Sequence, residues 1–170
     1  AVFHSHHTLA LFDDVLSADL TGDGVEELIL VRKAEKTLSI ITNASSDTLR
    51  PVNVLRLAIE PTRVIVGDIN NDKRPDLLVA DRNNPGVLPF MGQGKGMFRQ
   101  GTLIAPDNVI SDMALVHLNN DLLVDLVFYD WVKSELHCSY GIGRGRFLDL
   151  TTLPVNGMVQ ALTVTSLGKH

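Results

Sequence analysis

The sequence is short of the features that mark several protein classes. Its 170 residues include one cysteine, Cys138, which excludes an internal disulfide framework. The net charge is −5, and no run of basic residues with interleaved aromatic residues occurs, which argues against a general nucleic-acid binder. No apolar stretch approaches the roughly 20 residues that a membrane-spanning helix needs. The first residues also lack the basic-then-apolar pattern of a signal peptide.

Signs of helices and of catalysis are lacking as well. No window carries a sustained helical stripe with caps, so almost no helix is expected. No Ser-His-Asp order, paired-acid site or Cys-His couple stands apart from the rest of the sequence. Cys138 lies in an apparent strand with no second cysteine, which favours a buried thiol over a nucleophile. The prediction is therefore a protein that is not an enzyme, unless the chain belongs to a longer one.

The main signal is an internal repeat. In its first copy the landmarks are segment 15–19, segment 27–31, Leu38 and Leu49, and each recurs twice at intervals of 49 residues. A further copy begins at 161–165. Because separate landmarks keep one spacing over three copies, the period belongs to the architecture rather than to chance.

Each copy has the composition of β-strands. Short runs rich in Val, Ile and Leu alternate with clusters of Gly, Asn, Asp and Pro. The first copy predicts four strands, at 14–19, 27–32, 37–42 and 49–57. The strands beside the first loop are apolar at nearly every position, which is typical of strands buried on both faces. Four short strands in about 50 residues indicate a β-propeller blade, so the predicted fold is all-β, with blades of four antiparallel strands.

The repeat also predicts a division of the chain. The predicted parts are the end of a preceding blade at 1–13, blade repeats at 14–62, 63–111 and 112–159, and the start of a truncated fourth repeat at 160–170. Propellers close with about four to eight blades. Three complete copies are therefore expected to need further blades, from the same chain or from another copy; an open array is the remaining alternative.

An acidic loop between the first two strands of each copy carries the predicted chemistry. In the loops at 19–27 and 68–76, oxygen-bearing side chains occupy positions one, three, five and nine, and the carbonyl at position seven adds another oxygen. Calcium binds six to eight oxygens, whereas zinc and copper prefer the sulfur and imidazole that these loops lack. The predicted ligands are Asp19, Thr21, Asp23, Val25 and Glu27 in the first loop and Asp68, Asn70, Asp72, Arg74 and Asp76 in the second.

The third loop, at 117–125, is degraded. Its first position is His117, and imidazole is a poor calcium ligand. Asn119, Asp121 and Asp125 remain as doubtful ligands, so about two calcium sites are predicted in all. The alternative is that these loops are ordinary Asx turns with solvated acids.

Two surface motifs have competing explanations. His4, His6 and His7 could bind a transition metal, although such a cluster is more typical of a solvated loop. Asn43 begins an N-glycosylation sequon, which counts only in a secreted eukaryotic protein.

An aromatic pair offers one further candidate. Tyr129 and Trp131 could form a sugar-stacking face. The intervening Asp130 aligns with Asp81 of the preceding copy, which favours a structural turn instead.

The loops resemble those of the FG-GAP/VCBS repeat family, the integrin-alpha-like β-propellers. The family loop D-x-[DN]-x-D-G-x-x-D-[LIV] is similar to residues 19–28, with Thr21 and Glu27 substituting, and to residues 68–77, with Lys73 in place of Gly. In the family these loops bind calcium and support the fold.

Glycine-rich turns strengthen the resemblance. Residues 92–98 and 141–147 look like the family's glycine-rich turn ending in Phe, whereas the first copy has 43–49 without that turn. The resemblance extends from about residue 14 to the end and implies a seven-bladed parent propeller.

The resemblance implies a non-catalytic, calcium-stabilised module for extracellular protein or glycan recognition, cell adhesion or scaffolding. The alternatives are the propeller portion of a carbohydrate-active enzyme, such as a lyase or dehydratase, and an architectural repeat of a large surface or toxin-like protein. The expected location is extracellular, at the cell surface or, in a bacterium, periplasmic. The expected partners are a protein or glycan and further blades, with no nucleic acid and no membrane insertion.

Overall fold

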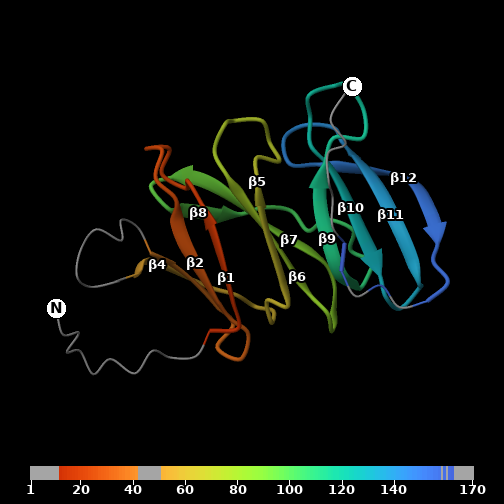
Figure 1. Ribbon diagram of the computed structural model, residues 1–170, viewed down its shortest axis with the longest axis horizontal. Coiled ribbons are helices and arrows are strands. Elements are labelled where there is room, and N and C mark those ends of the chain that lie inside the picture. The colour runs from red at the N-terminus through yellow and green to blue at the C-terminus, as the bar shows by residue number, and fades with distance from the viewer. Residues whose placement is uncertain (1–11, 42–50, 158, 160, 163–170) are drawn as a thin grey trace.

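The described part of the chain is built from three small β-sheets (Figure 1). The computed structural model describes residues 12–41, 51–157, 159 and 161–162. Sheet one contains β1 (Asp14–Ala18), β2 (Glu27–Arg32), β3 (Thr37–Ile41) and β4 (Pro51–Arg56). Sheet two contains β5 (Arg63–Gly67), β6 (Asp76–Asp81), β7 (Asn84–Gly94) and β8 (Met97–Gln100). Sheet three contains β9 (Ile110–Val116), β10 (Asp125–Asp130), β11 (Glu135–Gly141) and β12 (Phe147–Pro154).

Every sheet is an antiparallel meander whose spatial order follows the sequence. The prediction of four-stranded antiparallel units is therefore confirmed. The strand predicted at 27–32 coincides with β2, and that at 14–19 ends one residue later than β1. Positions 42, 49 and 50, at the ends of the two other predicted strands, lie outside the described residues.

No described residue is helical, as the sequence predicted. Accordingly, the described residues include no helix that is long and apolar enough to span a membrane. The three sheets follow one another along the molecule, and within the described residues they do not close into a ring (Figure 1).

The hydrophobic core lies in two layers between neighbouring sheets. The first layer, between sheets one and two, consists of Leu20, Ile29, Val31, Leu38, Ile40, Leu57, Val64, Leu77, Val79 and Phe90. The second, between sheets two and three, consists of Ile69, Leu78, Ala80, Val87, Met91, Ile104, Ile110, Met113, Leu126 and Phe128. Residues of β6 alternate between the two layers, so the whole strand is buried.

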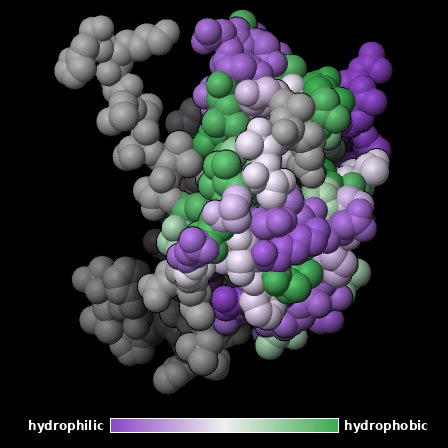
Figure 2. Space-filling view, turned by 90° about the vertical axis from the view of Figure 1, so that its right-hand side faces the viewer, coloured by the Kyte–Doolittle hydropathy of each residue, from purple (hydrophilic) through white to green (hydrophobic). Residues whose placement is uncertain are grey.

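Burial on both faces was predicted for the strands beside each loop. It is confirmed for β6, and β10 is buried at all but one position. The prediction is wrong for β1, where Val15 is 47% exposed, because no described sheet covers that side of sheet one. Seen from the sheet-three end, the surface mixes apolar and polar side chains (Figure 2).

Candidate functional site

The three acidic loops join the first and second strands of their sheets, as predicted. We name them loop one (19–27), loop two (68–76) and loop three (117–125). Position six is left-handed in each of them, with φ of 84° at Gly24, 67° at Lys73 and 65° at Leu122. A left-handed backbone costs a residue with a Cβ atom about 1 kcal/mol. The loop shape is therefore kept even where the glycine of the motif is missing.

The acid at position one organises the first two loops. Asp19 accepts backbone N–H groups from Gly22 at 2.7 Å, Asp23 at 3.2 Å and Gly24 at 2.9 Å. The Gly24 N–H makes the largest contribution to lowering the pKa of Asp19 below its ordinary value. Asp68 repeats the pattern, so backbone N–H groups of its own loop hold each of these carboxylates facing inward.

The acid at position nine is buried in all three loops and ties position two to the start of the second strand. The backbone N–H of Leu20 donates to Glu27 at 2.7 Å. The equivalent bonds are Ile69 to Asp76 at 3.0 Å and Leu118 to Asp125 at 2.6 Å. Position nine therefore has a structural function in addition to the ligand function predicted for it.

In sheets two and three the same acid also reaches the glycine-rich turn. The second oxygen of Asp76 accepts the N–H of Gly92 at 2.7 Å, and that of Asp125 accepts the N–H of Gly141 at 2.9 Å. A Cβ atom on Gly92 would collide with the carbonyl oxygen of Pro75. The sequence showed the acid and the glycine separately but gave no sign that they bond.

Loop two has the oxygen donors that a hard cation requires. Asn70 Oδ1 is buried and has no hydrogen-bond partner among the described residues. Asp72 uses Oδ1 to accept the N–H of Arg74 at 2.9 Å, and no described donor reaches its Oδ2. Burial, followed by the charges of Asp72 and Asp68, raises the pKa of Asp76 to about 6. An oxygen-binding cation would satisfy the orphaned amide and relieve this repulsion, so loop two fits calcium.

Carboxylates alone do not form a cage in this conformation. Across 12–41, 51–157, 159 and 161–162, no three Asp, Glu, His or Cys side chains converge as a metal-binding group. A cation in loop two would therefore also need Asn70 Oδ1 and the carbonyl of Arg74. Calcium accepts such mixed sets of carboxylate, amide and carbonyl oxygens.

In loop one, several of the predicted ligand oxygens already take part in hydrogen bonds within the loop. The hydroxyl of Thr21 donates to Glu27 Oε1 at 3.4 Å, and its backbone N–H donates to Glu27 Oε2 at 3.1 Å. Asp23 Oδ1 accepts the N–H of Val25 at 2.9 Å. In loop one, Thr21 thus contacts Glu27 and Asp23 contacts Val25, but none of the loop's side-chain oxygens is buried without a partner in the described structure.

Loop three satisfies its own polar groups. The ring Nδ1–H of His117 donates to the carbonyl of Leu123 at 2.9 Å, which is the position-seven carbonyl predicted to bind metal in the other loops. Asn119 and Asp121 bond to each other through both side chain and backbone, at 3.0 and 2.9 Å. In loop three the His117 N–H therefore occupies the position-seven carbonyl, which is predicted to bind a cation in loops one and two.

The proposed sugar-stacking face is only half available. Tyr129 is 2% exposed, so its ring cannot receive a ligand and that part of the prediction is wrong. Trp131 is 44% exposed, and the guanidinium of Arg82 lies 5.7 Å from its ring centroid. Asp81 and Asp130 are buried and accept backbone N–H groups of their turns, which confirms the structural explanation.

The remaining sequence candidates divide simply. His4, His6, His7 and Asn43 lie outside the described residues. Cys138 is partly buried, and burial raises the pKa of its thiol, which agrees with a structural cysteine.

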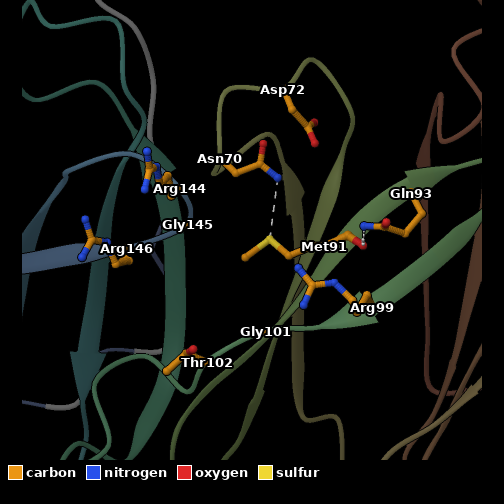
Figure 3. A pocket seen from close by; sticks show the side chains of 10 residues that line it. All are labelled: Asn70, Asp72, Met91, Gln93, Arg99, Gly101, Thr102, Arg144, Gly145 and Arg146. Carbon is orange, nitrogen blue, oxygen red and sulfur yellow. Dashed lines mark hydrogen bonds between the residues drawn. The ribbon is translucent and has the colours of Figure 1, made fainter.

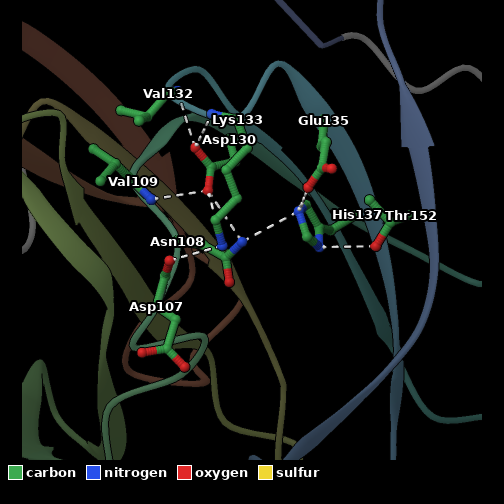
Figure 4. Close-up of polar contacts among 9 residues, drawn as sticks. All are labelled: Asp107, Asn108, Val109, Asp130, Val132, Lys133, Glu135, His137 and Thr152. Carbon is green, nitrogen blue, oxygen red and sulfur yellow. Dashed lines mark hydrogen bonds and ion pairs between the residues drawn. The ribbon is translucent and has the colours of Figure 1, made fainter.

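A buried polar cluster in sheet three escaped the sequence analysis (Figure 4). Asn108 Nδ2 contacts Asp130 Oδ2 at 3.1 Å and His137 Nε2 at 3.2 Å. The His137 ring stacks on Phe128, and its Nδ1 lies 3.4 Å from the hydroxyl of Thr152. Because Asn108 lies in the connection before β9, the cluster fixes that connection to sheet three.

The acidic loops and the meander sheets agree with one family comparison. Residues 19–79 match the FG-GAP-like repeat. This repeat begins at position one of loop one and ends within β6, so it includes both loops with the complete acidic pattern. The resemblance seen in the sequence is thus confirmed over this range. No curated protein is similar enough to the chain to count as a relative.

The buried acid of this FG-GAP-like repeat predicts a pH effect. In metal-free protein the pKa of Asp76 is about 6, above its ordinary value of 3.8. The protonated form therefore stabilises the fold: this contribution is fully present below about pH 4 and is lost as the pH rises through about 6. Urea unfolding with chelator, from about pH 4 to about pH 7, should show the free energy of unfolding of wild type falling relative to that of Asp76→Asn as the pH rises. A difference that does not change with pH would contradict the raised pKa.

Proposed function

We propose that the chain is a non-catalytic β-propeller-type module, stabilised by calcium, for extracellular recognition or scaffolding of a protein or glycan. The observation that carries the calcium part is the orphaned Asn70 Oδ1, in the same loop as Asp72 and Asp76. Burial, followed by the charges of Asp72 and Asp68, raises the pKa of Asp76 in that loop. The repeat match at 19–79 supports the propeller-type module. In this proposal loops one and two each hold one ion, and loop three holds none.

The end faces support the part of the proposal that invokes further blades. Ile69 and Ile104 are 5% and 9% exposed where sheet two meets sheet three. Their equivalents 49 residues later, Leu118 and Leu153, are 43% and 49% exposed on the far side of sheet three. At the opposite end, Val15 is the exposed equivalent of the buried Val64. Both end faces thus carry side chains that sheets elsewhere in the molecule bury against each other, and further blades, from this chain or another copy, would cover them.

Calcium titration tests the proposal. Calorimetry on chelator-stripped protein should give about two equivalents of calcium, and Asp72→Ala should lose one of them. At 100 times its dissociation constant, calcium should stabilise the fold by about 2.7 kcal/mol per site, or about 5–10 °C in Tm. Thermal melts with and without calcium measure that shift.

Asp121→Ala is the matched control. It removes the position-five acid from loop three, as Asp72→Ala does from loop two, and should leave both equivalents in place. Absence of binding heat together with an unchanged melt would reduce all three loops to Asx turns. Loss of an equivalent in the control would show that loop three binds metal after all.

A further inference from the structure

A cavity of about 410 Å³ opens between sheets two and three (Figure 3). Its lining consists of Asn70, Asp72, Met91, Gln93, Arg99, Gly101, Thr102, Arg144, Gly145 and Arg146. The N–H of Gly145 donates to the carbonyl of Ile69 at 3.1 Å, which fastens the turn before β12 to loop two. The two walls are therefore held together, and the volume lies in the range typical of small-molecule sites.

Three arginines give the cavity a charge opposite to that of the chain. Arg99 comes from β8, and Arg144 and Arg146 come from the turn before β12. All three are exposed, and none forms an ion pair with an acid in the described structure. Asp72 is the one acid in the lining. Unpaired guanidinium groups around a polar cavity are suited to carboxylates, which they bind through two parallel hydrogen bonds.

The repeat allows the lining of this cavity to be compared with the equivalent positions between sheets one and two. Between sheets one and two, the position equivalent to Arg146 is Met97, and the position equivalent to Gly101 is Val52. There Asn53 also donates to the carbonyl of Gly96 at 3.0 Å, a bond across the two sheets. In the second interface the equivalent residue is Thr102, for which the described structure has no such bond. The positions equivalent to Arg99 and Arg144 are Arg50 and Lys95, so Arg146 is the one arginine of the cavity without a basic equivalent in the first interface.

We propose that this cavity binds a small hydroxylated carboxylate of the sugar-acid class. The arginines bind the carboxylate, while Thr102 and Gln93 offer donors and acceptors for hydroxyl groups. Asp72 disfavours an anion beside loop two, so the carboxylate lies toward the arginines. The inference rests on the glycan-recognition part of the proposed function and specifies the class of glycan unit. It does not require calcium.

The test is an NMR titration of isotope-labelled protein in chelator-containing buffer, with glucuronate as the probe. Glucuronate should shift the amide signals of Gly101 and Gly145, and neutral glucose should not. Arg146→Met introduces the residue found at Met97 and should weaken glucuronate binding about fivefold, the limit typical of exposed ion pairs. Arg99→Met, on the other wall, should have a similar effect. Arg56→Met, on sheet one and outside the cavity, should change nothing.

The possible outcomes distinguish failure of the cavity inference from failure of the calcium part of the proposed function. Shifts with glucose as large as with glucuronate, no shifts at all, or equal weakening by Arg56→Met would overturn it. Inorganic sulfate that binds as tightly as glucuronate would leave a general oxyanion site and overturn the sugar-acid assignment. Glucuronate binding in protein that takes up no calcium would uphold the cavity while the calcium part of the proposed function fails. Calcium uptake without glucuronate binding would support the calcium part of the proposed function and overturn the sugar-acid inference.

Discussion

Asp125→Ala is expected to lower the free energy of unfolding by about 3 kcal/mol. The Asp125 carboxylate is fully buried and accepts two backbone N–H groups, from Leu118 at 2.6 Å and from Gly141 at 2.9 Å. Alanine would leave both donors unsatisfied, at a cost of about 1–3 kcal/mol each. Urea unfolding gives the free energy directly, and Tm should fall by about 6–12 °C in a chain of this size.

Loop three is the right place for this measurement because it is the loop to which no calcium is assigned. The matched control is Asp121→Ala in the same loop, since Asp121 is exposed and its bonds are local, to Asn119 and Leu123. It should cost less than about 1 kcal/mol. Equal losses for the two variants would contradict the stabilising function assigned to Asp125, because they would show that burial of this acid contributes nothing.

The sequence predicted the sheets well because their signals are local. The apolar run 28–31 directly follows the acid Glu27 and ends at Arg32, so the limits of β2 could be read from the sequence itself. Predicting the strand ends and the strand order within each sheet required no long-range information, since each sheet is a meander of consecutive strands. Because the sequence pattern occurs in three copies, the strands predicted in one copy could be checked against the other two.

Contacts between distant residues could not be predicted in this way. Asp76 and Gly92 are bonded, but they are 16 residues apart and come together only because β6 pairs with β7. The cavity is a stronger case, because Arg99 and Arg146 line it from different sheets and lie far apart in the sequence. Only the packing of sheet two on sheet three makes them neighbours.

Exposure was misjudged where a strand is covered on both faces. Tyr129 was taken as a candidate for ligand stacking because it adjoins Trp131. In a half-buried strand, alternation of apolar and polar residues would have shown which ring faces solvent. In β10 all but one residue is buried, so the pattern carries no such information and only Trp131, just beyond the strand, is exposed.

Gly141→Ala is expected to destabilise the protein by about 3 kcal/mol, at the upper end for overpacking. A Cβ atom at Gly141 would collide with the carbonyl oxygen of Val124 and lie 3.4 Å from the Cβ of Leu123. The backbone of Gly141 has no unusual φ, so the glycine is required for close approach rather than for conformational freedom. A backbone carbonyl cannot rotate out of the way as a side chain can, and the collision must move a strand. Equilibrium urea unfolding measures the loss.

Gly143→Ala separates these two causes. Gly143 has a φ of 79°, and no atom lies within 4 Å of the place that an alanine Cβ would take, so alanine there should cost only the left-handed strain of about 1 kcal/mol. A loss at Gly143 as large as that at Gly141 would show that strain, not collision, dominates in this turn.

The double variant Asp125→Ala with Gly141→Ala tests whether the two residues act together. Because Asp125 accepts its second bond from Gly141 itself, moving the strand already breaks part of what the acid contributes. The two losses should therefore sum to more than the loss of the double variant. Strict additivity would mean that the acid and the glycine, although bonded, stabilise sheet three independently.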